Sequence, residues 1–178
     1  GGAAAGRQIM AGPFSVVSAN VIGDSWIDSG NSSIVMGNMA PSATTADLTG
    51  NGSNNVTYMG NYLFGSGVWT HSSASGIILL GNNALESGFG TAGATGSVVV
   101  MGNKMTRFKS LNGSGVVFAG NNIANEIESF EVASGSADHK FLTESVVMGN
   151  KAADIGTSAV NEKLYLDNSV FSGNMASN

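Results

Sequence analysis

The apolar residues of this chain recur around eight sharp polar corners. The corner asparagines are Asn20, Asn38, Asn61, Asn82, Asn103, Asn121, Asn150 and Asn174. In the best-formed copy, residues 97–105, the β-branched run Val98-Val99-Val100 leads through Met101-Gly102 to the corner, and an apolar residue follows at Met105. This pattern predicts a short strand, a tight turn and a second strand. Successive corners are 18 to 29 residues apart, 22 on average, a period typical of a solenoid.

Two columns of apolar positions accompany the corners. With each asparagine as position zero, position −3 is apolar or aromatic in all eight copies: Val17, Val35, Tyr58, Leu79, Val100, Phe118, Val147 and Phe171. Position +2 is apolar as well: Ile22, Ala40, Leu63, Ala84, Met105, Ile123, Ala152 and Ala176. Position −5 is Val or Ile in the four middle copies and Ser in the outer four. Because side chains alternate along a strand, positions −5, −3 and +2 are expected on the interior face.

Position −4 is Val, Ile or Thr in every copy and is expected to point outward. The repeat therefore predicts an all-β protein, a parallel β-helix (β-solenoid) of about eight rungs. We expect residues 1–13 to form a flexible lead-in and residues 14–178 to form a single domain.

The Gly-Asn corner has a backbone reason. A two-residue bend between strands needs positive φ, which Gly and Asn adopt most readily. Asparagines at the same place in successive rungs can also bond along the stack and so satisfy amides buried at the corner. We therefore expect the eight asparagines to form a ladder, rather than eight independent turns.

Each interval between corners carries a further short apolar patch, such as Trp26-Ile27, Val68-Trp69 or Phe108 with Leu111. Polar Gly, Ser, Thr and Asn stretches flank these patches, which predicts a third strand in each rung. The longest interval, 29 residues, contains residues 134–140, which we expect to protrude as a loop.

Composition agrees with this picture and excludes several functions. The chain has 178 residues, of which 26 are Gly and only 11% are charged, as expected for one all-β domain with many turns. The net charge of −5 argues against a nucleic-acid partner, and the basic residues Lys104, Arg107 and Lys109 are expected on a solvated turn. With no Cys, a thiolate nucleophile, a Cys metal site and disulfides are excluded. There is no membrane-spanning run and no signal segment. The start at Gly1-Gly2 suggests a processed chain or a fragment.

The repeat resembles that of parallel β-helix proteins: pectate-lyase-like proteins, phage tailspikes and autotransporter passengers. Phe118-Ala119-Gly120-Asn121 and Phe171-Ser172-Gly173-Asn174 are similar to the Phe-x-x-Asn form of bacterial surface β-helices. The resemblance covers about residues 14–178. It implies a scaffold more than an activity, because these families share architecture far more than chemistry.

Two other repeat families have similar strings. Residues 145–152 and 80–85 resemble the head repeats of trimeric autotransporter adhesins and of phage fibres with a C-terminal chaperone. Those heads have shorter rungs, so the average of 22 residues disfavours them. Leucine-rich repeats share the string around the asparagine, but here no helical return segment follows, so this interpretation is rejected.

Candidate chemistry is sparse. Polysaccharide cleavage would need paired carboxylates or a base with a charge-neutralising partner, and the least unlikely catalytic residues are Asp24, Asp28, Glu126 and Glu128. Trp26 and Trp69 are candidates for stacking on a glycan. His71 and His139 stand apart from other ligand-type residues and are expected on surface loops. No metal site and no cofactor are predicted.

Two functions remain at this stage. The first is a non-catalytic structural or receptor- or glycan-binding module of a phage tail fibre, a tailspike or a bacterial surface protein, located on the virion tail or the cell surface. The second is a polysaccharide-degrading β-helix enzyme, a lyase or a glycoside hydrolase. No acid/base cluster recurs on adjacent rungs, which favours the first. The open ends of a solenoid and its apolar position −4 predict a homotrimer or continuation into neighbouring β-structure.

Overall fold

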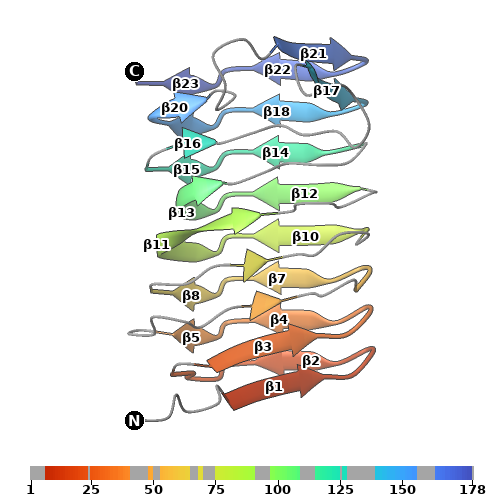
Figure 1. Cartoon of the computed structure of the whole chain (residues 1–178), viewed down its shortest axis with the longest axis vertical. Helices are drawn as coiled ribbons and strands as arrows, with labels where there is room; N and C mark the ends of the chain where they lie inside the picture. The colour runs from red at the N-terminus through yellow and green to blue at the C-terminus, as the bar shows by residue number, and fades with distance from the viewer. Residues whose placement is uncertain are drawn as a thin grey trace.

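The computed structural model describes residues 7–23, 25–40, 48–49, 53–64, 68–69, 75–90, 97–108, 115–124, 126–127, 139–155 and 163–177. Every regular element within these ranges is a β-strand, and every paired strand is parallel to its neighbour. The rungs stack along the long axis of the molecule, and the N- and C-termini lie at opposite ends of the stack (Figure 1). The prediction of an all-β parallel solenoid is confirmed.

One side of the solenoid is an eight-stranded sheet in chain order, with one strand before each corner asparagine. Partner residues occupy equivalent positions of the repeat, so that Val100 pairs with Leu79 on one side and Phe118 on the other. The strands are β2 (Val16–Ser18), β4 (Ile34–Met36), β7 (Thr57–Met59), β10 (Ile77–Leu80), β12 (Val98–Met101), β14 (Val117–Ala119), β18 (Val146–Met148) and β22 (Val170–Ser172).

The strands after the corners and those of the third side belong to one 13-stranded sheet. The strands directly after a corner are β5 (Met39–Ala40), β8 (Tyr62–Leu63), β15 (Asn122–Ile123), β19 (Lys151–Ala152) and β23 (Met175–Ala176). The third side contains β1 (Arg7–Ala11), β3 (Ser25–Ser29), β6 (Leu48–Thr49), β9 (Val68–Trp69), β16 (Glu126–Ile127) and β20 (Asp154–Ile155). Two strands run through both sides, β11 (Asn83–Gly90) and β13 (Lys104–Phe108).

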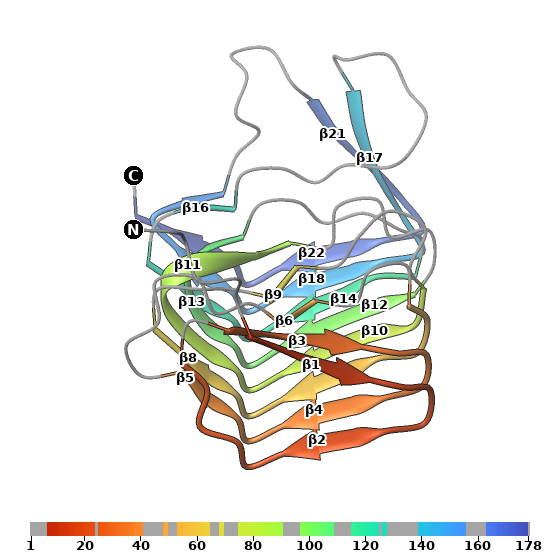
Figure 2. The same cartoon turned by 60° about the horizontal axis from the view of Figure 1, so that its bottom comes forward.

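A separate pair of strands leaves the stack. β17 (His139–Thr143) and β21 (Lys163–Asp167) pair with each other over five residues, and Figure 2 shows them projecting from the body of the solenoid. The predicted loop at residues 134–140 falls partly here, since His139 and Lys140 begin β17. Residues 134–138 lie outside the described residues.

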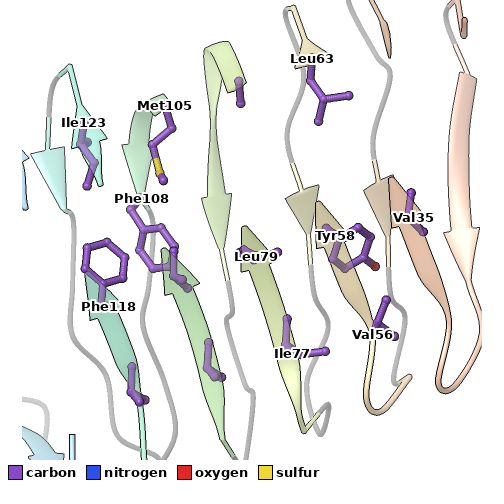
Figure 3. Packing of buried hydrophobic residues seen from close by; sticks show 14 of the residues in the cluster. Val35, Val56, Tyr58, Leu63, Ile77, Leu79, Met105, Phe108, Phe118 and Ile123 are labelled. Carbon is purple, nitrogen blue, oxygen red and sulfur yellow. The ribbon is translucent and has the colours of Figure 1, made fainter. Parts of the chain in front are cut away.

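The interior contains the predicted columns. Val35, Tyr58, Leu79, Val100 and Phe118 of position −3 are fully buried. Figure 3 shows the side chains of Val35, Tyr58, Leu79 and Phe118 within the packed interior. The +2 column is buried from Ile22 to Ala152. The third side adds Ile27 and Phe108, and the Phe108 ring meets the Phe118 ring edge to face at 4.9 Å between centroids.

The structure differs somewhat from the predicted eight rungs. The copies of the repeat are not equivalent, because they differ in the residue at −5 and in burial. Only four rungs have an apolar residue at −5, namely Val56, Ile77, Val98 and Val116, and all four are buried. The last rung is open: Phe171 at −3 is 38% exposed. At the other end, β1 lies inside the predicted lead-in and pairs with β3 along its full length, so the stack includes residues before 14.

The corner glycines adopt the left-handed conformation that the sequence predicts. Their φ angles run from 57° to 63° at Gly37, Gly60, Gly81, Gly102, Gly120, Gly149 and Gly173. A Cβ built on Gly102 would meet nothing within 4 Å, so the backbone conformation, and not lack of space, selects glycine there. The first corner uses Ala19 at φ 55° instead.

Candidate functional site

The corner asparagines form the predicted ladder. At the centre of the stack, the Oδ1 of Asn103 accepts from the backbone N–H of Asn82 at 2.9 Å and from the Nδ2 of Asn82 at 3.0 Å. The Nδ2 of Asn103 donates to the Oδ1 of Asn121 and to the carbonyl of Leu79. The same directed pattern repeats from Asn20 to Asn174.

This ladder is structural. The six inner asparagines are about 1% exposed or less, and their amide groups bond to one another and to backbone carbonyls. A buried amide whose bonding capacity is taken up in this way is a stabilising element with no atom left for a ligand. The functional surface must therefore lie elsewhere.

The side of the eight-stranded sheet that faces away from the interior is the strongest candidate, and we call it the outer face. It consists of the −4 and −2 positions, whose side chains alternate with the buried ones. Position −4 contributes Val16, Ile34, Thr57, Ile78, Val99, Val117, Val146 and Val170. Position −2 contributes Ser18, Met36, Met59, Leu80, Met101, Ala119, Met148 and Ser172.

Strand register makes these residues two continuous columns. Met59 is the register partner of both Met36 and Leu80, and Leu80 is in turn the partner of Met101. With strands about 4.8 Å apart, eight of them extend the outer face over about 34 Å. The columns therefore form one long, regular surface.

The outer face is apolar and open to solvent. The four methionines are 36% to 42% exposed, and Val16 and Val170 at the two ends are 63% and 50% exposed. None of its sixteen residues is charged. Parallel sheets are normally covered on both faces, and a contiguous exposed apolar patch of this length marks an interaction surface. Threonine, as at Thr57, also has a high β-propensity and exposes less hydrocarbon than valine or isoleucine. Strand propensity alone therefore does not require the apolar residues of this face.

Charge lies beside this face and not on it. In the strands after the corners, Lys104 and Lys151 are exposed, with Asn122 between them in register. Of the predicted basic cluster, Lys104 lies at the surface, but it begins strand β13, so the prediction of a turn is wrong there. The side chain of Arg107 and all of Lys109 lie outside the described residues.

The candidate catalytic residues are not brought together by the described structure. Asp28 is half-buried in β3, on the third side. Glu126 lies in β16, but its side chain is outside the described part of the chain, as are Asp24 and Glu128 altogether. Trp26 and Trp69 belong to β3 and β9, and the glycan-stacking role of their side chains stays a prediction.

Two further findings concern ligands and membranes. No group of three or more His, Cys, Asp or Glu residues able to hold a metal ion occurs in the described ranges. His139 lies in the projecting strand β17 and not on the predicted surface loop, whereas His71 falls outside the described ranges. Within those same ranges, no helix has the length and apolar character to cross a membrane.

One buried hydroxyl pair lies under the sheet. The Tyr58 hydroxyl and the Ser29 Oγ are 2.6 Å apart and buried. Burial raises the pKa of Tyr58 above its ordinary value of 10.0; the hydrogen bond with Ser29 lowers it in part, and the charge of Asp28 raises it further. Tyr58 is therefore a neutral, hydrogen-bonded core residue and not a reactive phenol.

Sequence reasoning did not identify position −2 as part of a site. The signal was present, because Met stands directly before the corner glycine in four copies, Met36, Met59, Met101 and Met148. Alternation predicts that −2 and −4 share a face. Columns −3 and +2 carry the fold prediction, and column −4 alone carries the prediction of an outward surface.

Comparisons with protein-family models, with curated proteins and with solved structures find no match for this chain. Its function must therefore be argued from its own surface.

Proposed function

We propose that this chain is a non-catalytic structural or binding module of a phage tail fibre, a tailspike or a bacterial surface protein. The observation that supports this is the outer face, an apolar strip of about 34 Å without a charged side chain. The similarity of the repeats to surface β-helices supports a location on the virion tail or the cell surface.

The chemistry of the outer face favours a protein partner over a sugar. Valine, isoleucine and methionine supply apolar contact but few hydrogen bonds, whereas sugars need polar groups and aromatic platforms. Met side chains adapt to irregular apolar surfaces. The partner we propose is another copy of the chain, in a homotrimer with the three outer faces turned toward a common axis.

A pair of lysine substitutions tests this role. Met101→Lys places a charge at the centre of the outer face, where Met101 is 42% exposed. Met39→Lys is the matched control: Met39 is 46% exposed but lies in β5, after the corner. In light scattering of dilute protein we expect a trimer for wild type and for Met39→Lys, and a monomer for Met101→Lys with an unchanged circular dichroism spectrum. A monomeric wild type would contradict the proposal.

A glycan panel tests the binding alternative and the enzyme alternative together. Bacterial capsular and lipopolysaccharide glycans should be scored for retention and for shortened products. Retention lost on Trp26→Ala or Trp69→Ala would show glycan binding at the third side. Chain shortening abolished by Asp24→Asn, Asp28→Asn, Glu126→Gln or Glu128→Gln would establish polysaccharide cleavage and overturn the non-catalytic assignment.

A further inference from the structure

A row of polar side chains runs along the strands that directly follow the corners, and we call it the polar row. It consists of the residues one position after the corner asparagine in four successive rungs: Asn83, Lys104, Asn122 and Lys151. Strand register places them next to one another in this order, on the stacked strands β11, β13, β15 and β19 (Figure 1). Their side chains alternate with the buried +2 column and so point outward. Amide and ammonium groups therefore alternate along the row.

The backbone fixes the spacing of the polar row. Each member donates its backbone N–H to the carbonyl of the corner asparagine one rung before, as Lys104 does to Asn82 at 2.9 Å and Lys151 to Asn121 at 2.9 Å. Neighbouring strands lie about 4.8 Å apart, so the Cα atoms of the two lysines are about 9.6 Å apart, with Asn122 between them. The row thus repeats one polar side chain per rung and one positive charge per two rungs.

Small residues border the polar row. On one side are the corner glycines, and a Cβ built on Gly102 or Gly120 would meet nothing within 4 Å. On the other side, position +3 is Thr106, Ala124 and Ala153 beside the last three members of the row. An extended polymer can therefore lie along the row and reach the lysine and asparagine side chains without meeting a large side chain at its borders.

The charge of the polar row is of one sign. Lys104 and Lys151 are exposed, and they are the only charged residues at positions +1 and +3 in all eight copies. The next carboxylate after Lys151 in the chain, that of Asp154, belongs to β20 on the third side. The whole chain has a net charge of −5, which disfavours a densely charged polyanion such as nucleic acid. A ligand with sparse negative charges at the spacing of the lysines fits better.

Two further residues are suited to a sugar. Asn83 is half-buried, and its Oδ1 is buried and accepts no hydrogen bond from the described residues, whereas nearly all buried acceptors are paired. Rotation of this amide toward a ligand therefore breaks no bond at its oxygen. Tyr62, also half-buried, is the register partner of Asn83 and extends the row with an aromatic ring. Amides bond hydroxyl groups in both directions, and a ring supplies apolar contact.

We propose that the polar row binds a linear acidic glycan in which a uronic acid alternates with a neutral sugar. One rung is close to the length of one sugar along an extended chain, so successive sugars meet successive rungs. Two carboxylates pair with the ammonium groups of Lys104 and Lys151, and Asn83 and Asn122 bond the neutral sugars. The site lies on a different side of the solenoid from the outer face. It can hold or fail independently of the proposed trimer.

Hyaluronan oligosaccharides are a suitable probe, because hyaluronan carries a carboxylate on every second sugar. Fluorescence anisotropy of the labelled probe at low ionic strength, where exposed charge pairs are least screened, should show binding by the wild-type chain. Lys104→Gln/Lys151→Gln should raise the Kd at least about tenfold, because two charge-assisted bonds are lost, with an unchanged circular dichroism spectrum. The matched control Lys140→Gln/Lys163→Gln removes the same charge from the projecting strands β17 and β21 and should keep wild-type affinity. Carboxyl-reduced hyaluronan should bind as weakly as hyaluronan does to the first variant.

An exchange of two residues tests the spacing itself. Asn122→Lys/Lys151→Asn keeps the composition and the net charge but places the lysines on adjacent rungs, about 4.8 Å apart. It should bind hyaluronan as weakly as Lys151→Gln alone, whereas its affinity for polygalacturonate, which has a carboxylate on every sugar, should not fall. The proposal is overturned if wild type does not bind hyaluronan, if carboxyl reduction or the exchange leaves its affinity unchanged, or if the control pair loses as much. Equally tight binding of single-stranded DNA would also overturn it, since any polyanion would then suffice.

Discussion

At the scale of single residues, asparagine dominates this protein because each corner must satisfy several buried amides with one small side chain. The side chain supplies one acceptor and two donors, and each inner corner uses them all. Each side-chain amide accepts hydrogen bonds from the preceding rung and donates one to the following rung. The ladder therefore lets a rung bury its corner without water. Eight matched copies made this role predictable from the sequence.

We expect Asn103→Ala to lower the free energy of unfolding by about 1–3 kcal/mol, because it leaves the N–H and Nδ2 of Asn82 without their shared acceptor. The matched control is Asn122→Ala, since Asn122 is exposed in β15 and should change stability by less than about 0.5 kcal/mol. Chemical denaturation of both variants checks this. Equal stability of the two would show that the ladder does not contribute.

At the scale of the element, the corner sets the strand ends. Most corners place glycine at positive φ before the asparagine, but the first places Ala19 there at φ 55°. An L-residue in this conformation carries a cost of about 1–2 kcal/mol, which glycine avoids while losing some entropy in the unfolded chain. The first corner is therefore strained relative to the others.

We expect Ala19→Gly to stabilise the protein by about 0.5–1 kcal/mol, the difference between these two effects. Ala119→Gly is the control, because Ala119 lies within strand β14, where glycine should destabilise by about 0.5–1 kcal/mol. Melting temperatures of the two variants should therefore move in opposite directions. A lower melting temperature for Ala19→Gly would mean that the alanine makes contacts that outweigh its backbone strain.

The strands around the corners were predictable because their apolar columns repeat along the chain. Pairings that occur only once, such as those of β17 and β1, were not predictable in this way. Alternation around the corners placed Val100 and Phe118 inside and Val99 outside. The pairing of β17 with β21 has no periodic signal, since residues 139–143 and 163–167 join outside the corner pattern. Nor did the sequence show that β1 belongs to the stack, because residues 7–11 precede the first corner and their partner β3 lies 18 residues on. The outer face combines columns −4 and −2, and only column −4 is predicted from the sequence to point outward.

At the scale of the whole molecule, stability should vary along the stack. A solenoid is held together by contacts between neighbouring rungs, so an end rung has half the support of an inner one. The gradient is visible in burial: Phe118 is fully buried, whereas Phe171 at the same position is 38% exposed. The residues at position −5 reinforce this difference in stability. They are Ser in the outer rungs and Val or Ile in the middle rungs.

Hydrogen exchange should report this gradient amide by amide. We expect amides of β10, β12 and β14 to exchange at least tenfold more slowly than those of β22 and β23, because inner strands open only with the whole stack, whereas the last rung can open alone. The measurement is exchange mass spectrometry of dilute protein. Uniform exchange along the stack would mean instead that the rungs unfold as a single cooperative unit.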